Sequence, residues 1–120
     1  MAQFFKDSNG KVITALSEGV EAPAGFSELT ANTEDAAHEK HVPAVDVERD
    51  GHVIRVRIGE TEHPMLPEHY IEWVALEADG RLEVHHLKPG EKPATFFAGG
   101  AKKGTVYAYC NLHGLWAKEF

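Results

Sequence analysis

The chain has 120 residues, one cysteine and a formal charge of −7 at neutral pH. This length allows one domain with a hydrophobic core plus a small appendage, and an apolar content of 42% is typical of a soluble globular protein. The acidic charge argues against nucleic acid as a partner, because phosphate contacts need clustered lysine and arginine.

The cysteine count and the hydropathy pattern also restrict the cellular setting. A single cysteine excludes an intrachain disulfide framework and fits a reducing compartment. No apolar run approaches the ~20 residues that a membrane-spanning helix needs. The first residues, MAQFFKDSNG, show no signal-peptide pattern. We therefore expect a cytoplasmic protein without a membrane partner.

Residues 1–37 form the first predicted region. Two short strands are expected on either side of Asn9-Gly10, a strong signal for a two-residue hairpin. Pro23 and Gly25 interrupt the stretch that follows. Residues 32–37 predict one helical turn, with an asparagine at its N-cap and acidic residues in its first turn.

From residue 42 onward the pattern is one of short strands and turns. Ile54, Val56 and Ile58 alternate with arginines, which indicates a strand with one buried and one solvated face. Turn signals such as Asp50-Gly51 and Asp79-Gly80 recur at fairly regular spacing. These features predict an all-β fold, an antiparallel β-sandwich. The expected strands are 45–47, 54–58, 69–77, 82–85, 95–97 and, as the last one, 105–110.

The only cysteine lies at the end of this last predicted strand, in the sequence Cys110-Asn111-Leu112-His113-Gly114. Val106, Ala108 and Cys110 share one face of the strand. A glycine-containing loop at a strand end can turn the thiolate of Cys110 and the imidazole of His113 onto one metal ion. The alternative is a buried structural cysteine beside an unrelated loop histidine.

Three further histidines are candidates for the same ion. His63 and His69 flank a loop with two prolines, which limits the entropy lost when both rings converge. His41 precedes Val42-Pro43, so its backbone is biased away from helix. We expect the remaining histidines not to bind metal: His38, His52, His85 and His86.

The donor set itself favours iron over zinc. A structural zinc site is closed by four nitrogen or sulfur ligands, whereas one thiolate and four imidazoles make five. Five such ligands leave one vacant octahedral position, which suits an iron that binds a small oxidant. A thiolate opposite that position pushes electron density toward the bound oxygen, as in thiolate haem enzymes.

Four sequence blocks carry a resemblance to a known family. They are EKHVP at 39–43, HPMLPEHYIEW at 63–73, LKPG at 87–90 and CNLHGLW at 110–116. In this order and spacing they resemble the superoxide reductases of the desulfoferrodoxin and neelaredoxin family. The blocks span residues 39–116, and each contains an expected ligand or neighbouring residue.

This resemblance implies a seven-stranded immunoglobulin-like sandwich with one iron ion (Fe2+/Fe3+) per chain. It implies that Cys110 is the axial ligand and that the equatorial ligands are His41, His63, His69 and His113. Lys40 would attract superoxide and help to protonate the product, and Glu39 would occupy the sixth position of the ferric resting state. The implied reaction is the one-electron reduction of superoxide to hydrogen peroxide, with a rubredoxin-like protein as electron donor. We also expect a homodimer or a homotetramer.

The N-terminal region departs from one branch of that family. Desulfoferrodoxins begin with a small domain whose iron is held by four cysteines, but no cysteine lies in residues 1–109. A tetrathiolate centre is therefore impossible. We interpret residues 1–37 as a remnant of the desulforedoxin-like segment without metal, and residues 38–120 as the iron domain.

Three other functions stay open at this level. The first is a redox-inert module that binds zinc through cysteine and histidine. The second is an electron carrier whose iron is coordinatively blocked. The third is superoxide dismutation, which would evolve dioxygen.

Overall fold

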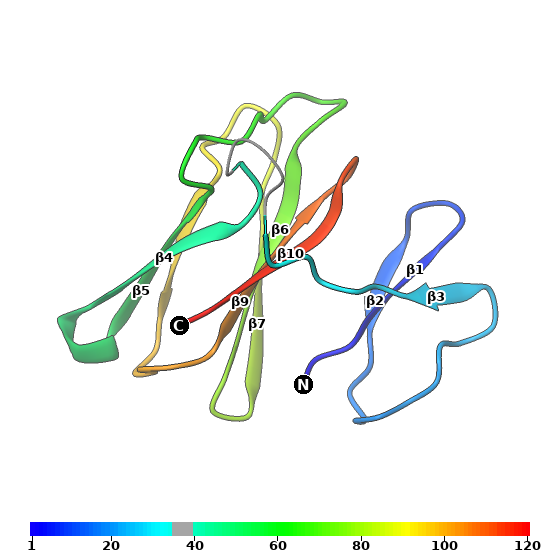
Figure 1. The fold of residues 1–120 in the computed structure, drawn as a ribbon, viewed down its shortest axis with the longest axis horizontal. Helices are drawn as coiled ribbons and strands as arrows, with labels where there is room; N and C mark the ends of the chain where they lie inside the picture. Colours follow the sequence, from blue (N-terminus) through cyan, green and yellow to red (C-terminus); the bar gives the residue numbers. More distant parts are fainter. Residues whose placement is uncertain (35–39) are drawn as a thin grey trace. The chain divides into compact units, whose positions relative to one another are not determined.

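The computed structural model describes residues 1–34 and 40–120, which form strands joined by turns (Figure 1). They divide into two compact units, Met1–Thr30 and Ala31–Phe120. Residues just after this division belong to the second unit because Asn32 forms a parallel bridge with Trp116. Part of the helical turn predicted at 32–37 lies outside the described residues. Within the described ranges, no helix is long and apolar enough to cross a membrane.

The first unit is a small antiparallel sheet. Its strands are β1 (Phe4–Asp7), β2 (Val12–Thr14) and β3 (Phe26–Glu28), in the order β2-β1-β3. The predicted hairpin joins β1 to β2: Gly10 adopts a φ of +83°, and the carboxylate of Asp7 accepts hydrogen bonds from two backbone amides of the turn. The strand β3 was not predicted, because Pro23 and Gly25 obscure a segment of only three residues.

The second unit is a sandwich of seven antiparallel strands (Figure 1). One sheet has the order β10-β9-β6-β7 and the other the order β4-β5-β8. A short 3-10 helix, η1 (Arg49–Gly51), joins β4 to β5 at the predicted Asp50-Gly51 turn. The prediction of an all-β antiparallel sandwich is confirmed. The strands are β4 (Pro43–Glu48), β5 (Val53–Ile58), β6 (Ile71–Ala78), β7 (Arg81–His86), β8 (Ala94–Ala98), β9 (Thr105–Cys110) and β10 (Gly114–Glu119).

The core between the two sheets is built from the predicted alternation. Ile54, Val56 and Ile58 of β5 are buried, whereas the arginines between them are exposed. A register shift between Ile71 and Trp73 in β6, a β-bulge, brings both Ile71 and Val74 into the core. The inner face of β9 adds Val106, Ala108 and Cys110, as predicted.

The expectation that 105–110 is the last strand was wrong. The chain turns back after Cys110 and forms β10, which pairs with β9 from Gly114↔Cys110 to Glu119↔Thr105. This strand lacks an alternation of apolar and charged residues, because Leu115 and Ala117 are buried on one face and Trp116 is half-buried on the other.

Candidate metal centre

Strand register brings the candidate ligands to one end of the sandwich. In one sheet Pro43 at the start of β4 pairs with Ile58 at the end of β5. In the other sheet Cys110 at the end of β9 pairs with both Ile71 and Gly114, the first residues of β6 and β10. The segments that precede or connect these positions carry the four histidines. The fold thus collects residues that lie up to 72 positions apart.

Four imidazoles form a closed ring of neighbours. Going around the ring, His41 lies beside His63, His63 beside His69, His69 beside His113, and His113 beside His41. The centroid separations in this order are 4.8, 4.8, 5.0 and 4.9 Å. Each pair meets edge to face, with interplanar angles of 65°, 80°, 74° and 75°. Such a ring directs one nitrogen from each imidazole toward a common space.

The donor atoms are close enough to share one ion. One ligand atom from each of His41, His63, His69, Cys110 and His113 lies within 4.8 Å of all the others. His41 Nε2 is 3.2 Å from His113 Nδ1, and Cys110 Sγ is 3.8 Å from the same nitrogen. Nitrogen donors on opposite sides of a metal ion would lie about 4.2 Å apart, given bonds of about 2.1 Å. The five residues therefore fit a metal.

His63 is held in the tautomer that a metal ligand needs. Its Nδ1 is 2.7 Å from the carbonyl oxygen of Pro64, which can only accept a hydrogen bond, so Nδ1 carries the proton. Its Nε2 is then a lone-pair donor, and this atom is buried without a hydrogen-bond partner. The Nε2 of His69 is likewise buried and without a partner. Buried polar atoms without partners are uncommon in proteins, and a metal ion would satisfy both.

Burial also sets the protonation of these histidines. Desolvation lowers the pKa of His63 from 6.5 to about 4, against the opposing effect of its hydrogen bond to Pro64. Desolvation lowers the pKa of His69 as well, and the neighbouring His113 and His41 add to the effect. Both rings are therefore neutral at physiological pH and ready to bind a cation.

Cys110 is fully buried, and desolvation raises the pKa of its thiol. The backbone amides of His113 and Leu112 donate hydrogen bonds to the sulfur and oppose this rise. A bound cation would favour the thiolate further, since a coordinating thiol is deprotonated. The buried sulfur is therefore better suited to binding a metal than to acting as a free nucleophile.

Comparison with known proteins identifies the family. A sequence model of the family Desulfoferrodoxin matches residues 33–119. The chain belongs to the desulfoferrodoxin family. It is 45% identical over 117 residues to the desulfoferrodoxin of Clostridium acetobutylicum, covering 95% of this chain and 91% of that protein. It is 39% identical over 107 residues to the superoxide reductase of Pyrococcus horikoshii, covering 75% and 93%.

The fold comparison agrees with this membership. The crystal structure of the superoxide reductase from Treponema pallidum matches with a TM-score of 0.76 and 33% sequence identity, covering 98% of each chain. The one-iron superoxide reductase from Giardia intestinalis matches with a TM-score of 0.60 and 29% identity, covering 69% of this chain and 98% of that one. The all-β sandwich is therefore the fold of the superoxide reductases.

The structure places most of the site residues predicted from the sequence. The five candidate ligands come together in one cluster. Lys40 is partly buried and directly precedes His41, whereas Glu39 lies outside the described residues. Of the histidines expected not to bind metal, His52 and His86 are exposed, and His38 lies outside the described residues. Both ring nitrogens of His85 form hydrogen bonds elsewhere: Nδ1 with the hydroxyl of Thr95 and Nε2 with the carboxylate of Glu83, each at 2.7 Å.

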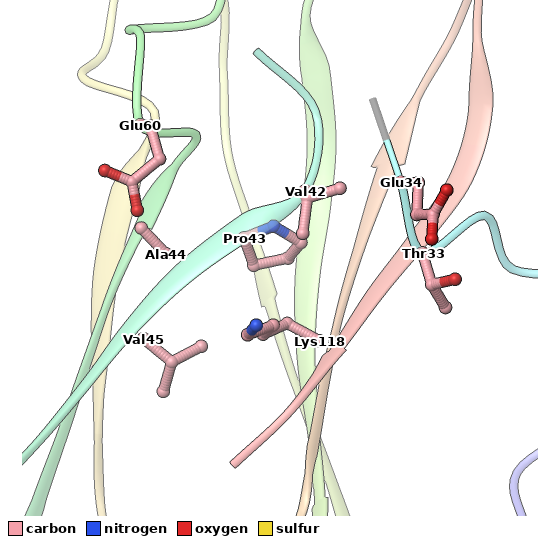
Figure 2. A pocket seen from close by; sticks show the side chains of 8 residues that line it. All are labelled: Thr33, Glu34, Val42, Pro43, Ala44, Val45, Glu60 and Lys118. Atoms are coloured by element: carbon pink, nitrogen blue, oxygen red, sulfur yellow. The ribbon is translucent and has the colours of Figure 1, made fainter. Parts of the chain in front are cut away.

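A hollow of about 530 Å³ lies beside β4 (Figure 2). It adjoins Val42, the neighbour of His41, and its polar groups are Thr33, Glu34, Glu60 and Lys118. None of the five donor residues is among those that line it. Among the five donor residues His113 is exposed, whereas His63 and Cys110 are buried.

Asn111 was missed as a supporting residue. Its Oδ1 accepts a hydrogen bond from the Tyr70 backbone amide at 2.9 Å, and its Nδ2 donates to the Glu68 carbonyl at 3.0 Å. Its own amide donates to the Tyr70 carbonyl at 3.2 Å. The Asn111 side chain thus links Glu68 and Tyr70, the two sequence neighbours of His69, to the loop that follows Cys110. The signal in the sequence is an asparagine between two candidate ligands.

We expect Asn111→Ala to lower the free energy of unfolding of the metal-free protein by about 1–3 kcal/mol, because two backbone groups lose their partners. Urea unfolding followed by circular dichroism measures this change. Asn111→Asp should also destabilise the protein, since one carboxylate oxygen would face the Glu68 carbonyl. Leu112→Ala at the exposed neighbouring position is the control, and equal stability of Asn111→Ala and Leu112→Ala would contradict the role of the amide.

Proposed function

We propose that this protein is a superoxide reductase that binds one iron ion through His41, His63, His69, Cys110 and His113. The observation that carries the proposal is the closed ring of four imidazoles joined by the only thiol of the chain. Relatives named superoxide reductase support it. The proposed reaction consumes one superoxide, one electron and two protons, and it yields hydrogen peroxide.

Iron held by these five donors would supply the electron and one open coordination position for superoxide. The protein residues prepare that chemistry. The Pro64 carbonyl fixes the proton on Nδ1 of His63 and leaves Nε2 to bind. Cys110, as the thiolate that a bound cation would favour, would supply negative charge to the iron. His113 is the exposed member of the donor set, so we propose that superoxide reaches the centre from the side on which this residue lies.

Lys40 is proposed to attract the anionic substrate. The chain carries a net charge of −7, so its overall field repels superoxide. A lysine next to His41 can dominate locally, because charges within a Debye length of about 8–10 Å are only partly screened. Glu39, the preceding residue, is proposed to occupy the open position of the oxidised centre.

We expect Lys40→Ala to slow the second-order reaction with superoxide by about tenfold, within the range known for electrostatic steering, and to flatten its dependence on ionic strength. Pulse-radiolysis rates over a series of salt concentrations measure both effects. Lys102→Ala is the matched control. Lys102 lies in the loop before β9, at the opposite end of that strand from Cys110, and it forms an ion pair with Asp50 of η1. An unchanged salt slope for Lys40→Ala would remove it from this role.

Other parts of the proposal rest on the family and on composition. We propose a rubredoxin-like protein as the electron donor, a homodimer or homotetramer as the assembly, and the cytoplasm as the location. The reducing cytoplasm would keep the thiol of Cys110 available for the metal. Residues 1–37 are proposed to be a remnant of the desulforedoxin-like segment, with a role in dimer packing.

Metal analysis combined with the visible spectrum tests the function. About one iron per chain, a thiolate-to-iron band on oxidation, and its bleaching by superoxide without dioxygen evolution would support superoxide reduction. A colourless protein that holds stoichiometric zinc after iron reconstitution would favour a redox-inert zinc module instead. Dioxygen evolution would indicate a dismutase. Failure of azide and cyanide to bind the iron would indicate an electron carrier.

A further inference from the structure

We propose that Trp116 is a positioning residue: it holds two adjacent metal ligands, His41 and His113, in a fixed orientation relative to each other. The inference rests on the proposed metal-binding function of the five donors. It concerns a residue outside the donor set, one that touches one ligand through its ring and the other through its N–H.

The first contact is a stack between the indole of Trp116 and the imidazole of His41. Their ring centroids are 4.5 Å apart and their planes differ by 15°. Within the ring of four imidazoles, by contrast, His41 meets its neighbours edge to face. The indole therefore supports the flat face of His41 and limits the rotation of its ring out of the orientation that points Nε2 at His113.

The five ligands lie on different elements of the fold. Cys110 is the last residue of β9, and His63 and His69 are held by backbone hydrogen bonds to Ile58 and Leu66. His41 lies in an irregular bend before β4 begins at Pro43. The stack on Trp116 is a side-chain contact that helps to fix the orientation of the His41 ring.

The second contact joins Trp116 to the other ligand. Its Nε1–H donates a hydrogen bond to the backbone carbonyl of His113 at 3.1 Å. This bond ties the turn between β9 and β10 to the same indole that stacks on His41. Because His41 Nε2 and His113 Nδ1 lie only 3.2 Å apart, a small displacement of either ring would disturb the geometry of both donors.

Trp116 itself has a firm anchor in the second unit. It pairs with Ala108 of β9 on one side of β10. On the other side it forms a bridge with Asn32, and the neighbouring Ala117 amide donates to the Asn32 carbonyl at 2.9 Å. The backbone of β10 is thus held from both sides at this point, so the indole is a fixed reference for the two ligands.

Titration of the metal-free protein with Co²⁺ tests this role, because both the affinity and the visible spectrum report ligand geometry. Trp116→Leu removes the stack and the N–H, and we expect it to weaken Co²⁺ binding about 10–100-fold, the usual effect of losing a residue that orients a ligand. Trp116→Phe keeps an aromatic face for His41 and should recover part of that loss. Both variants should shift the Co²⁺ absorption bands.

Trp73→Phe is the matched control. Trp73 is the only other tryptophan in the sequence, and it stacks on Tyr109, with centroids 5.5 Å apart. We expect this control to keep the wild-type Co²⁺ affinity and spectrum. Circular dichroism and urea unfolding establish that each variant is folded.

The outcomes separate this proposal from the proposed function. Wild-type affinity and spectrum in folded Trp116→Leu would overturn the positioning role. If that variant does not fold, Trp116→Phe decides: weaker binding with shifted bands supports the role, and unchanged values overturn it. Wild-type protein that binds Co²⁺ but, loaded with iron, does not reduce superoxide would refute the proposed function while the Trp116 comparison still stands. Wild-type protein that binds no Co²⁺ would overturn both.

Discussion

Replacing Cys110 with serine is expected to abolish the thiolate-to-iron charge-transfer band and with it superoxide reduction. Cys110 is the only cysteine in the sequence, so no other residue of the chain can give rise to a thiolate band. A serine hydroxyl stays protonated at physiological pH and lacks the polarizable sulfur that supplies charge to the metal. Visible spectra of the iron-loaded, oxidised protein measure the band, and stopped-flow consumption of superoxide measures the activity.

Loss of activity must be separated from loss of the fold, because Cys110 belongs to the hydrophobic core. Ala108→Ser is the matched control: it places the same hydroxyl on the same inner face of β9, two residues away, at a position that is also fully buried. We expect Ala108→Ser to destabilise the protein while keeping the charge-transfer band. A band that persists in Cys110→Ser would show that the sulfur does not bind iron.

The candidate ligands were predictable because they lie in short blocks whose residue types specify chemistry. Cys110 and His113 lie in one short turn that ends at Gly114, and His63 and His69 flank a stiff loop with two prolines. The convergence of these blocks with His41 could not be derived from spacing, since it depends on the register of β4 with β5 and of β9 with β6. It was proposed from the combination of the cysteine and histidine motifs and from the family resemblance, and the structure brings the five residues together.

The supporting residues could not be predicted, because their roles depend on contacts between distant positions. Asn111 fastens a loop 43 positions away, and Trp116 stacks on His41 across the gap between β10 and the start of β4. Neither residue type specifies such a role in a single sequence. Only the fold shows which ligand each one supports.

Some strands could be predicted from their local sequence pattern, whereas others depend on tertiary context. Strands with one solvent-exposed face, such as β5, were predicted from the alternation of apolar and polar residues. Strand β6 begins two residues later than expected, since His69 and Tyr70 lie in the ligand loop. Strand β10 was missed because both of its faces carry apolar side chains, so its sequence has no period of two.

Acidification is expected to destabilise the metal-free protein through His63. Burial lowers the pKa of this imidazole to about 4 in the folded state, whereas the unfolded value is 6.5. Between these two values the unfolded chain binds a proton that the folded chain excludes, so stability is fully present above pH 6.5 and falls as the pH is lowered toward 4. The shift of about 2.5 pH units corresponds to a loss of about 3 kcal/mol in the free energy of unfolding.

Urea unfolding of the metal-free protein at a series of pH values from 7 to 4 measures this slope. His69 adds to it in the same direction, because desolvation lowers its pKa too. His63→Gln removes the titrating group, and we expect it to flatten most of the slope even though it lowers stability at pH 7. His86→Gln, at an exposed position outside the donor set, is the matched control. If His63→Gln lost as much stability on acidification as the wild type, burial of the neutral His63 ring could not be the cause. A flattened slope would show that the fold itself excludes the proton that competes with a metal for His63 Nε2.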